Sequence, residues 1–342
     1  MDIKQAIKAV VAHQDLDKDD MIDVMQAIMS GETSDMLNAA FLVGLQTKGV
    51  KASEILGGAT VMRKLATPVN VSVGPHLVDT CGTGGSGSNK FNVSTAAAIV
   101  AACSGAYVAK HGNRGATSKS GSADVLEAAG VKLDLTPEQV AATIDEVGVG
   151  FMFAPAHHSA MKHVIAARKE VGLRTIFNLL GPLTNPAGAP NQLMGVYDQA
   201  WIEPLLEVFK ELGSRHVLVV SSDDGLDEIS ISAPTMIGEL KQDKITVTNV
   251  QPKTLGIAKY KDYSMLQIHS AEESLEMIKA AFVGSNTAAR DMVAINAGAA
   301  IYAANLSDDL VSGVEQAREI LDSGAATGKL AQLVTFTQEF GA

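Results

Sequence analysis

The feature that most constrains this chain is a glycine-dense loop, Gly82-Thr83-Gly84-Gly85-Ser86-Gly87, between an apolar run ending at Asp79 and a helix-forming run beginning near Ser94. Glycine lets backbone N–H groups turn towards a phosphate, and the free amides at a helix start favour negative charge. The chain carries 38 acidic residues, yet none lies between Thr80 and Ala123. The same window contains four basic residues, Lys90, Lys110, Arg114 and Lys119. We therefore predict a binding site for a small polyanion.

Two familiar glycine-loop motifs fit this sequence poorly. Gly82-x-Gly84-x-x-Gly87 matches the dinucleotide fingerprint, but that site needs an acidic residue at the end of the next strand. Here the next predicted strand, Ala106 to Ala109, runs into Lys110-His111. The nucleotide-triphosphate loop also fails, because Ser88 and Asn89 stand where it requires Lys and then Ser or Thr. A dinucleotide dehydrogenase is thus disfavoured, and a plain chain-reversing turn remains the alternative interpretation of the loop.

Four separated segments carry a resemblance to a known family. In chain order they read GTGG(S)G followed by FNVST, KHGNRGATSKSGSADVLEAAG, RTIFNLLGPLTNP and GLDEIS. At this spacing they resemble the anthranilate phosphoribosyltransferases, and the similarity extends over nearly the whole chain. The resemblance implies a pentosyltransferase that moves the phosphoribosyl group of 5-phosphoribosyl 1-diphosphate to the amine of anthranilate, giving N-(5-phosphoribosyl)anthranilate and diphosphate. That reaction is the second step of tryptophan biosynthesis from chorismate.

Composition limits the compartment and the partners. The 342 residues, 46% of them hydrophobic, suffice for two domains and a large core. The N-terminal MDIKQAIKAV lacks a signal-peptide pattern, and no apolar run approaches the roughly 20 residues that span a bilayer. Cys81 and Cys103 fit neither a disulfide framework nor a metal-ligand spacing, so we expect a cytoplasmic protein without a membrane partner. The net charge of −11 argues against nucleic acid as a partner.

Residues 1 to about 70 predict helices only. Two runs cover Ile3 to Gln14 and Met21 to Ser30, Ser34 caps a third that ends at Gly49, and Ser53 opens a fourth that stops at Pro68. We therefore expect a small all-helical domain over residues 1–70. The resemblance adds a return segment near residues 160–190 that rejoins this domain.

From Leu77 onward, short β-rich runs alternate with helical runs, which predicts an α/β domain with a central, largely parallel sheet flanked by helices. The expected strands are Leu77-Val78, Tyr107-Val108, Gly150–Phe153, Leu193–Val196 and Val217–Val220. The expected helices are Ser94–Ser104, Ser122–Ala129, Pro137–Val147, His158–Val171 and Trp201–Leu212. Residues 233–260 depart from this pattern and suggest an antiparallel excursion, and the last sixty or so residues are helical. With the return segment set aside, residues 75–160 and 191–342 form this second domain.

The resemblance also assigns the residues that bind the phosphoribosyl donor. Ser94 and Thr95 fit this role on their own, because hydroxyls and free amides at a helix start face an anion together, although simple N-capping would explain them too. The full set comprises Gly82, Gly85, Ser86, Lys90, Asn92, Val93, Ser94, Thr95, Lys110, His111, Gly112, Asn113, Arg114, Gly115, Ala116, Thr117, Ser118 and Ser122.

A magnesium site is predicted beside the donor. Adjacent carboxylates at Asp227-Glu228 follow a strand and a turn at Gly225, as suits the hard oxygen ligands that Mg²⁺ prefers. Asp223 and Asp224 offer a second pair that the residues alone leave open, and an ordinary acidic turn on the surface is the alternative interpretation of the whole segment. The resemblance selects Asp227 and Glu228, adds Ser94 as a ligand, and implies two Mg²⁺ ions per site.

Acceptor binding requires orientation more than base catalysis, because the aromatic amine of anthranilate is already unprotonated at neutral pH. The resemblance assigns this role to Asn113, Arg168 and the backbone near Gly82, with His111 close by. A guanidinium on the predicted helix His158–Val171 can hold a carboxylate in a bidentate pair, although a solvated arginine is an equally ordinary use of that position.

The glycine loop departs from the family pattern at two positions. Asp usually follows GTGG and Thr usually precedes the Phe-Asn segment, whereas this chain has Ser86 and Lys90 there. The loop therefore gains two units of positive charge. We hypothesise that Lys90 partly replaces metal as a counter-charge for the diphosphate. The alternative is a side chain that points into solvent from a mobile loop.

Two other functions share features with this interpretation. A pyrimidine nucleoside phosphorylase has the same architecture but would need a base-recognition motif, which we do not find. A non-catalytic nucleic-acid-binding relative would be expected to carry a basic surface, which the net charge opposes.

The resemblance further implies a homodimer formed through the helical domain. Kinetic constants, feedback regulation, association with neighbouring pathway enzymes and the effect of Ser86 and Lys90 are not determined by the sequence.

Overall fold

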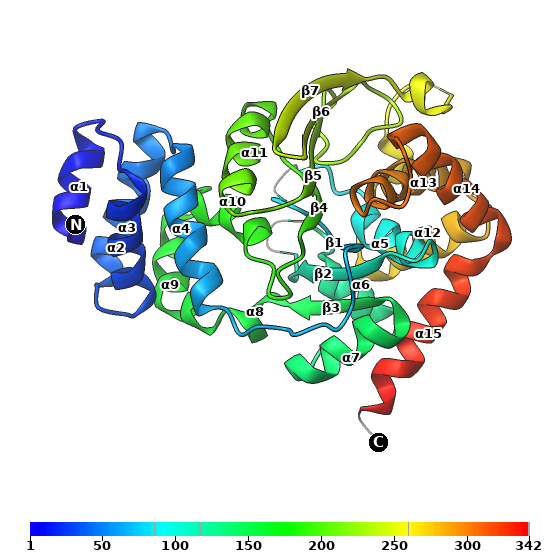
Figure 1. The fold of residues 1–342 in the computed structure, drawn as a ribbon, viewed down its shortest axis with the longest axis horizontal. Coiled ribbons are helices and arrows are strands. Elements are labelled where there is room, and N and C mark those ends of the chain that lie inside the picture. The colour runs from blue at the N-terminus through cyan, green and yellow to red at the C-terminus, as the bar shows by residue number, and fades with distance from the viewer. Residues whose placement is uncertain (85–86, 116–117, 259, 341–342) are drawn as a thin grey trace.

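A central twisted sheet with helices on both faces forms most of the molecule, and a helical bundle stands at one end (Figure 1). The structure is a computed structural model that describes residues 1–84, 87–115, 118–258 and 260–340. This arrangement confirms the predicted fold class. No helix in the described part of the chain is long and apolar enough to cross a membrane.

The N-terminal bundle consists of α1 (Ile3–Val11), α2 (Lys18–Met29), α3 (Asp35–Lys48) and α4 (Ala52–Leu65). Ser34 caps α3 as predicted, and Gly49, with a φ of 90°, ends it in the left-handed region that favours glycine. The prediction that Ser53 opens the fourth helix is wrong. Lys51 is the N-cap of α4, and the Ser53 hydroxyl instead donates to the Leu16 carbonyl at 2.9 Å. That bond ties α4 to the segment before α2.

The seven strands of the sheet lie in the order β3-β2-β1-β4-β5-β6-β7. The first five pair in parallel, and β6 and β7 continue the sheet antiparallel, as predicted for residues 233–260. The strands are β1 (Leu77–Gly82), β2 (Tyr107–Gly112), β3 (Val149–Phe153), β4 (Asn191–Gly195), β5 (His216–Ser222), β6 (Thr235–Lys241) and β7 (Lys244–Val250). Strands β1 and β2 run farther than predicted, because polar residues continue the ladder to Gly82 and Gly112.

Alternate residues of the strands face two different helical layers. In β5, Leu218 and Val220 pack in the core with α5, whereas Val217 and Val219 pack in the core with α11 and the bundle. The remaining helices are α5 (Val93–Cys103), α6 (Ser122–Ala128), α7 (Pro137–Val147), α8 (Ala154–His157), α9 (Lys162–Val171), α10 (Ile176–Leu180), α11 (Ile202–Glu211), α12 (Ala271–Phe282), α13 (Thr287–Ala303), α14 (Leu310–Ser323) and α15 (Ala325–Glu339). Short 3₁₀ turns occupy Ser159–Met161, Gly181–Leu183, Gln199–Trp201, Pro252–Leu255 and Ser264–Leu266.

The predicted continuous helix from His158 to Val171 is wrong at its beginning. His158 has φ −120° and ψ 57°, which ends α8, and a 3₁₀ turn separates it from α9. Helix α9 then packs against α2 and α3, and α10 packs against α3 and α4 (Figure 1). The amide of Asn38 on α3 donates to the His163 carbonyl at 3.2 Å. Residues 162–180 thus contact the bundle far away in sequence.

The strand order creates a switch point between β1 and β4. The chain proceeds from β1 outward to β2 and β3, then returns to place β4 on the other side of β1. Parallel strands whose connections diverge in this way leave a crevice at their carboxyl ends, which is where α/β sheets bind ligands. Gly82 ends β1 and pairs with Gly195 at the end of β4. The glycine-rich loop therefore begins at the switch point.

Candidate active site

Two glycines at the switch point make room for an acidic loop. A Cβ on Gly195 would lie 1.8 Å from the Asp227 carbonyl oxygen, and a Cβ on Gly82 would lie 3.1 Å from Asp227 Oδ2. Gly195 cannot carry a side chain unless the loop moves away, and a side chain at Gly82 would require the Asp227 carboxylate to shift by a small amount. The ends of β1 and β4 therefore hold the Asp227 carboxylate over the switch point, next to the glycine-rich loop.

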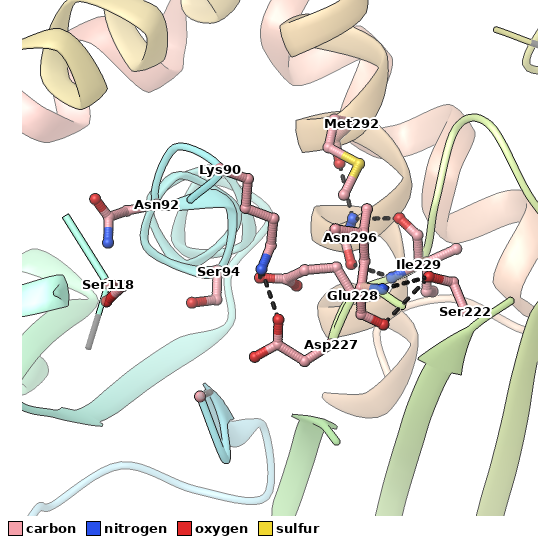
Figure 2. A network of polar contacts seen from close by, with 12 residues as sticks. Lys90, Asn92, Ser94, Ser118, Ser222, Asp227, Glu228, Ile229, Met292 and Asn296 are labelled. Atoms are coloured by element: carbon pink, nitrogen blue, oxygen red, sulfur yellow. Dashed lines mark hydrogen bonds and ion pairs between the residues drawn. The ribbon is translucent and has the colours of Figure 1, made fainter. Parts of the chain in front are cut away.

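The Asp227-Glu228 segment follows β5 and is fixed from behind by a buried amide. Gly225, at φ 83°, turns the chain. Asn296 on α13 accepts a hydrogen bond from the Ile229 N–H at 3.0 Å and donates to the Ile229 carbonyl at 3.0 Å (Figure 2). Because Asn296 matches both backbone groups of Ile229, it sets the position of the two carboxylates that precede this residue.

Lys90 points into the same site. Its Nζ lies 2.6 Å from Asp227 Oδ1 and 4.0 Å from Glu228 Oε1 (Figure 2). Burial disfavours the charge on Lys90, but the two carboxylates outweigh it and hold the pKa of the ammonium above its usual value. Burial raises the pKa of Glu228 to about 7, with Asp227 adding to the shift and Lys90 opposing it. The expectation that Lys90 points into solvent, the alternative raised above, is wrong because its side chain is only 10% exposed.

A second buried lysine lies on the β2 side of the site. Lys110 Nζ donates to the Thr80 carbonyl and, at 3.2 Å, to the Ser94 hydroxyl. The Ser94 backbone also lies near enough to the Glu228 carboxylate to oppose the rise in its pKa. Burial lowers the pKa of the Lys110 ammonium, and the buried Asp79 carboxylate opposes that shift. Ser94 therefore connects Lys110 to the acidic pair.

The buried carboxylate of Asp79, on β1, connects this strand to β2 beside the site. Its carboxylate accepts hydrogen bonds from the His111 N–H at 3.1 Å and from the Asn185 amide at 2.7 Å. Burial raises the pKa of Asp79, and the Asn185 bond opposes that rise. Asn185 also donates to the Ala109 carbonyl at 2.8 Å. This network couples the 176–185 segment to the strand that carries Lys110 and His111.

Asn92 joins the two loops that were predicted to bind the donor. Its Oδ1 accepts from the Ser120 and Ser274 hydroxyls, each at 2.7 Å, and its Nδ2 donates to the Ser120 carbonyl at 3.2 Å. Asn92 is the N-cap residue of α5 without a side-chain cap bond, so neither Ser94 nor Thr95 acts as the N-cap. Thr95 Oγ1 is buried and lacks a partner among the described residues, whereas Val93 packs in the core.

The loop after β2 is held by Asp124. Its Oδ2 accepts from the Gly115 N–H at 2.9 Å and the Gly121 N–H at 2.8 Å, which closes the loop. Arg114 binds Glu127 at 2.6 Å and Asp124 at 3.1 Å, on the exposed side of the loop. The structure therefore does not bring Arg114 to Lys90 and the carboxylates. This loop and its two ends contain four more of the predicted donor residues, Gly112, Asn113, Ser118 and Ser122. Four others lie outside the described residues: Gly85, Ser86, Ala116 and Thr117.

The residues predicted for the acceptor lie on the β2 side and on α9. Arg168 stacks over the Phe177 ring at 5.2 Å, and within the described ranges its guanidinium has no hydrogen-bond or ion-pair partner. Burial lowers the pKa of Arg168. The rings of His111 and His158 lie 5.0 Å apart, and burial lowers their pKa values to about 3 and about 4, so both are neutral at pH 7. Nε2 of each ring is buried without a partner in the described part of the chain.

The structure distinguishes the two acidic pairs that the sequence left open. Asp224 accepts hydrogen bonds from three hydroxyls, those of Ser222 at 2.5 Å, Ser230 at 2.7 Å and Ser232 at 2.6 Å, which fixes the turn after β5. Asp223 is exposed and accepts from Gln199 at 2.8 Å. Asp227 and Glu228 instead contact Lys90 and lie on the side of Ser94 (Figure 2). Two carboxylates and a hydroxyl suit Mg²⁺, which takes its other ligands from water and phosphate.

Several residues that build this site were missed by the sequence analysis. Asn296 and Ser274 lie on C-terminal helices, Gly195 ends a strand, and Asp79 and Asn185 are far apart in sequence. The lone polar residue within the apolar run Met292–Ala300 was a signal for Asn296, because a buried amide needs partners.

Replacement of Asn296 tests its role behind the carboxylates. We expect Asn296→Ala to lose about 2 kcal/mol or more of unfolding free energy, because the Ile229 N–H and carbonyl would be buried without partners. Urea denaturation measures this loss, and Mn²⁺ titration followed by electron paramagnetic resonance should show weaker metal binding. Asn249→Ala, on the exposed face of β7, is the control and should change stability by less than about 0.5 kcal/mol. An Asn296→Ala protein as stable as the parent would contradict this role.

Comparisons with known proteins agree with this architecture. Residues 4–66 match the helical bundle domain of a glycosyl transferase family, and residues 74–327 match its a/b domain. The chain is 55% identical over 337 residues to the anthranilate phosphoribosyltransferase of Thioalkalivibrio sulfidiphilus, covering 98% of this chain and 99% of the relative. It is also 55% identical over 344 residues to that of Hahella chejuensis, covering 99% of each.

Solved structures show the same fold. The anthranilate phosphoribosyltransferase of Thermus thermophilus superposes with a TM-score of 0.91 at 40% identity, covering 97% of this chain and 99% of the other. The Saccharomyces cerevisiae enzyme in complex with PRPP and Mg superposes with a TM-score of 0.89 at 24% identity, covering 98% of each chain. The resemblance found in the four sequence segments is confirmed, and the chain belongs to the anthranilate phosphoribosyltransferase family.

Proposed function

We propose that this protein transfers the phosphoribosyl group of 5-phosphoribosyl 1-diphosphate to the amine of anthranilate. The observation that carries the proposal is the cluster at the switch point, where Asp227, Glu228 and Ser94 face two buried lysines, Lys90 and Lys110. Displacement of diphosphate from an anomeric carbon builds negative charge on the leaving group. Fixed cations and metal ligands beside a glycine-rich loop stabilise that charge.

The donor binds along the carboxyl ends of β1 and β2 in this proposal. The glycine-rich loop and the start of α5 supply backbone N–H groups, and Thr95 supplies a buried hydroxyl that has no other partner in the described ranges. The Asn92 bonds to Ser120 support a role in holding the two donor loops together. The remaining donor residues predicted from the sequence stay predictions at their positions in these loops.

Mg²⁺ is the cofactor, and Asp227, Glu228 and Ser94 would hold it. The all-oxygen donor set supports this, and the yeast relative was solved with PRPP and Mg. The ion supplies Lewis-acid stabilisation of the diphosphate as it leaves. Asp227, Glu228 and Ser94 offer three oxygen-bearing side chains, and phosphate oxygens and water would supply the remaining ligands. Two ions per site remain our expectation from the family resemblance.

Anthranilate binds between α9 and the end of β2. Arg168, whose guanidinium is free of described ion-pair partners, would hold the carboxylate, with Asn113 and the backbone near Gly82 beside it. The neutral ring of His111 offers an unpartnered Nε2 to the acceptor. Because the aromatic amine is unprotonated at neutral pH, the residues orient it and need not remove a proton before attack.

The chain divides into a helical domain of residues 1–70 with the 160–190 segment, and an α/β domain of residues 75–160 and 191–342. The packing of α9 and α10 on the bundle supports this division.

We infer a cytoplasmic enzyme without nucleic-acid or membrane partners, from its biosynthetic family and composition. Fractionation of the protein with membranes would contradict this inference. The division into domains would be contradicted if limited proteolysis released residues 1–70 without α9 and α10 attached.

The loss of anthranilate fluorescence on addition of 5-phosphoribosyl 1-diphosphate and Mg²⁺ tests the function. We expect turnover in the parent and a loss of roughly a hundredfold or more in Asp227→Asn/Glu228→Gln at limiting Mg²⁺, partly restored by excess metal. Asp223→Asn, at the neighbouring exposed acid, is the matched control and should keep the parent's metal dependence. Absence of turnover by the parent under all metal conditions would refute the activity.

Arg168→Ala tests the acceptor site. The KM for anthranilate should rise about tenfold or more while the KM for the donor changes little, since the guanidinium would hold only the acceptor. Lys169→Ala removes an exposed charge from the same helix and should leave both constants near the parent values. Equal effects of Arg168→Ala on both substrates would indicate a structural role for α9.

A homodimer through the helical domain is the expected assembly. Large apolar side chains are exposed on this domain, with Met36 82%, Val11 66% and Ile165 55% exposed. Exposed apolar side chains that form one contiguous patch mark protein–protein interaction sites, and these three belong to helices that contact one another, α1 to α3 and α3 to α9. Sedimentation equilibrium should give the mass of two chains, and Met36→Glu should shift the distribution towards one chain. A monomeric parent at micromolar concentration would contradict the proposal.

A further inference from the structure

Lys90 occupies a cation position inside the acidic pair. Its ammonium lies 2.6 Å from Asp227 Oδ1 and 4.0 Å from Glu228 Oε1, and the side chains of these three residues are about equally buried, at 10%, 9% and 11% exposure. Figure 2 shows the Lys90 side chain reaching from before α5 towards the two carboxylates. The pair is therefore neutralised in part by the protein itself.

The backbone holds Lys90 in this orientation. The Phe91 N–H donates to the Leu266 carbonyl at 3.0 Å, and the Ile268 N–H donates to the Asn89 carbonyl at 2.8 Å. Lys90 itself forms an antiparallel bridge with Gln267. The backbone on both sides of Lys90 is thus bonded to residues 266–268. These bonds fix the backbone from which the Lys90 side chain extends towards the carboxylates.

A metal that binds Asp227 must share this carboxylate with the ammonium or displace it. Lysine carries a compact point charge on a flexible stem, so it can leave the carboxylate and follow a negative ligand without moving the backbone. A diphosphate entering beside the glycine-rich loop would provide such a ligand. The ammonium and the metal ion compete for the same carboxylate oxygen, so removal of the ammonium should strengthen metal binding.

We propose that Lys90 is an intramolecular competitor for the metal site, which keeps the Asp227-Glu228 pair weakly receptive to divalent cations until a diphosphate draws its ammonium away. Lys90 is a positioning residue in this scheme, because it controls when the carboxylates are free. The inference rests on the proposed metal role of Asp227 and Glu228.

Mn²⁺ binding to the free enzyme, followed by electron paramagnetic resonance without donor or acceptor, tests the proposal apart from turnover. Lys90→Met removes the charge and keeps most of the side-chain volume, so it should bind Mn²⁺ about tenfold more tightly than the parent. Lys90→Arg keeps the charge and should stay within about threefold of the parent. Lys64→Met removes an exposed charge from α4, away from the site, and should leave the affinity unchanged.

The outcomes separate this inference from the metal site on which it depends. Equal or weaker Mn²⁺ binding by folded Lys90→Met would overturn the role of Lys90. Absence of Mn²⁺ binding in every variant, including the parent, would overturn the metal site as well. If Lys90→Met does not fold, Lys90→Thr replaces it. Neutral variants that fold only with millimolar Mg²⁺ would support the exchange of ammonium for metal, and variants that fail to fold with Mg²⁺ would refute it.

Discussion

The site depends on the approach of one acidic loop to two strand ends that lack side chains. Gly82 and Gly195 pair at the switch point, and the backbone of Asp227 lies where a Cβ on Gly195 would have to be. Closely packed interiors cannot absorb such an overlap without a shift of the backbone. The rest follows from this approach: the carboxylates lie beside the glycine-rich loop, and Asn296 must hold them from the other side.

Charge balance is the second constraint. Asp227 and Glu228 lie opposite Lys90, and Lys110 donates to Ser94. Asp79, buried on the neighbouring strand β1, accepts from the backbone N–H of His111, the residue after Lys110. Buried charges are tolerated when they are paired and hydrogen-bonded, and here nearly every partner comes from a different element. An enzyme that binds and releases a diphosphate needs cationic side chains that offset the negative charge of the diphosphate. The glycine-rich loop, free of acidic residues, keeps the entering anion from being repelled.

Local sequence patterns predicted most of the elements because they depend on short-range physics. Ser34 and Gly49 mark the ends of α3, and apolar runs mark the cores of β1 to β5. The two failures have tertiary causes. The pattern predicts a cap at Ser53, whose hydroxyl instead serves Leu16, and a helix through His158, whose backbone is not helical. Hydrogen bonds and ring contacts to distant residues override propensity at both positions.

The sequence alone determined the chemistry that this protein can perform. The acid-free stretch from Thr80 to Ala123 and the glycine loop predicted a site for a small polyanion, and the family resemblance of four segments identified the phosphoribosyl donor and selected Asp227 and Glu228 as ligands of a hard metal ion. Only the tertiary structure decided which groups meet. In the fold, serine hydroxyls donate hydrogen bonds to Asp224, so this carboxylate serves the turn. The Lys90 ammonium instead pairs with Asp227, 137 residues away in the sequence. Strand order and packing determine such contacts, because they bring together residues that are far apart in the sequence. The distance between two residues along the chain does not reveal that they meet in the fold.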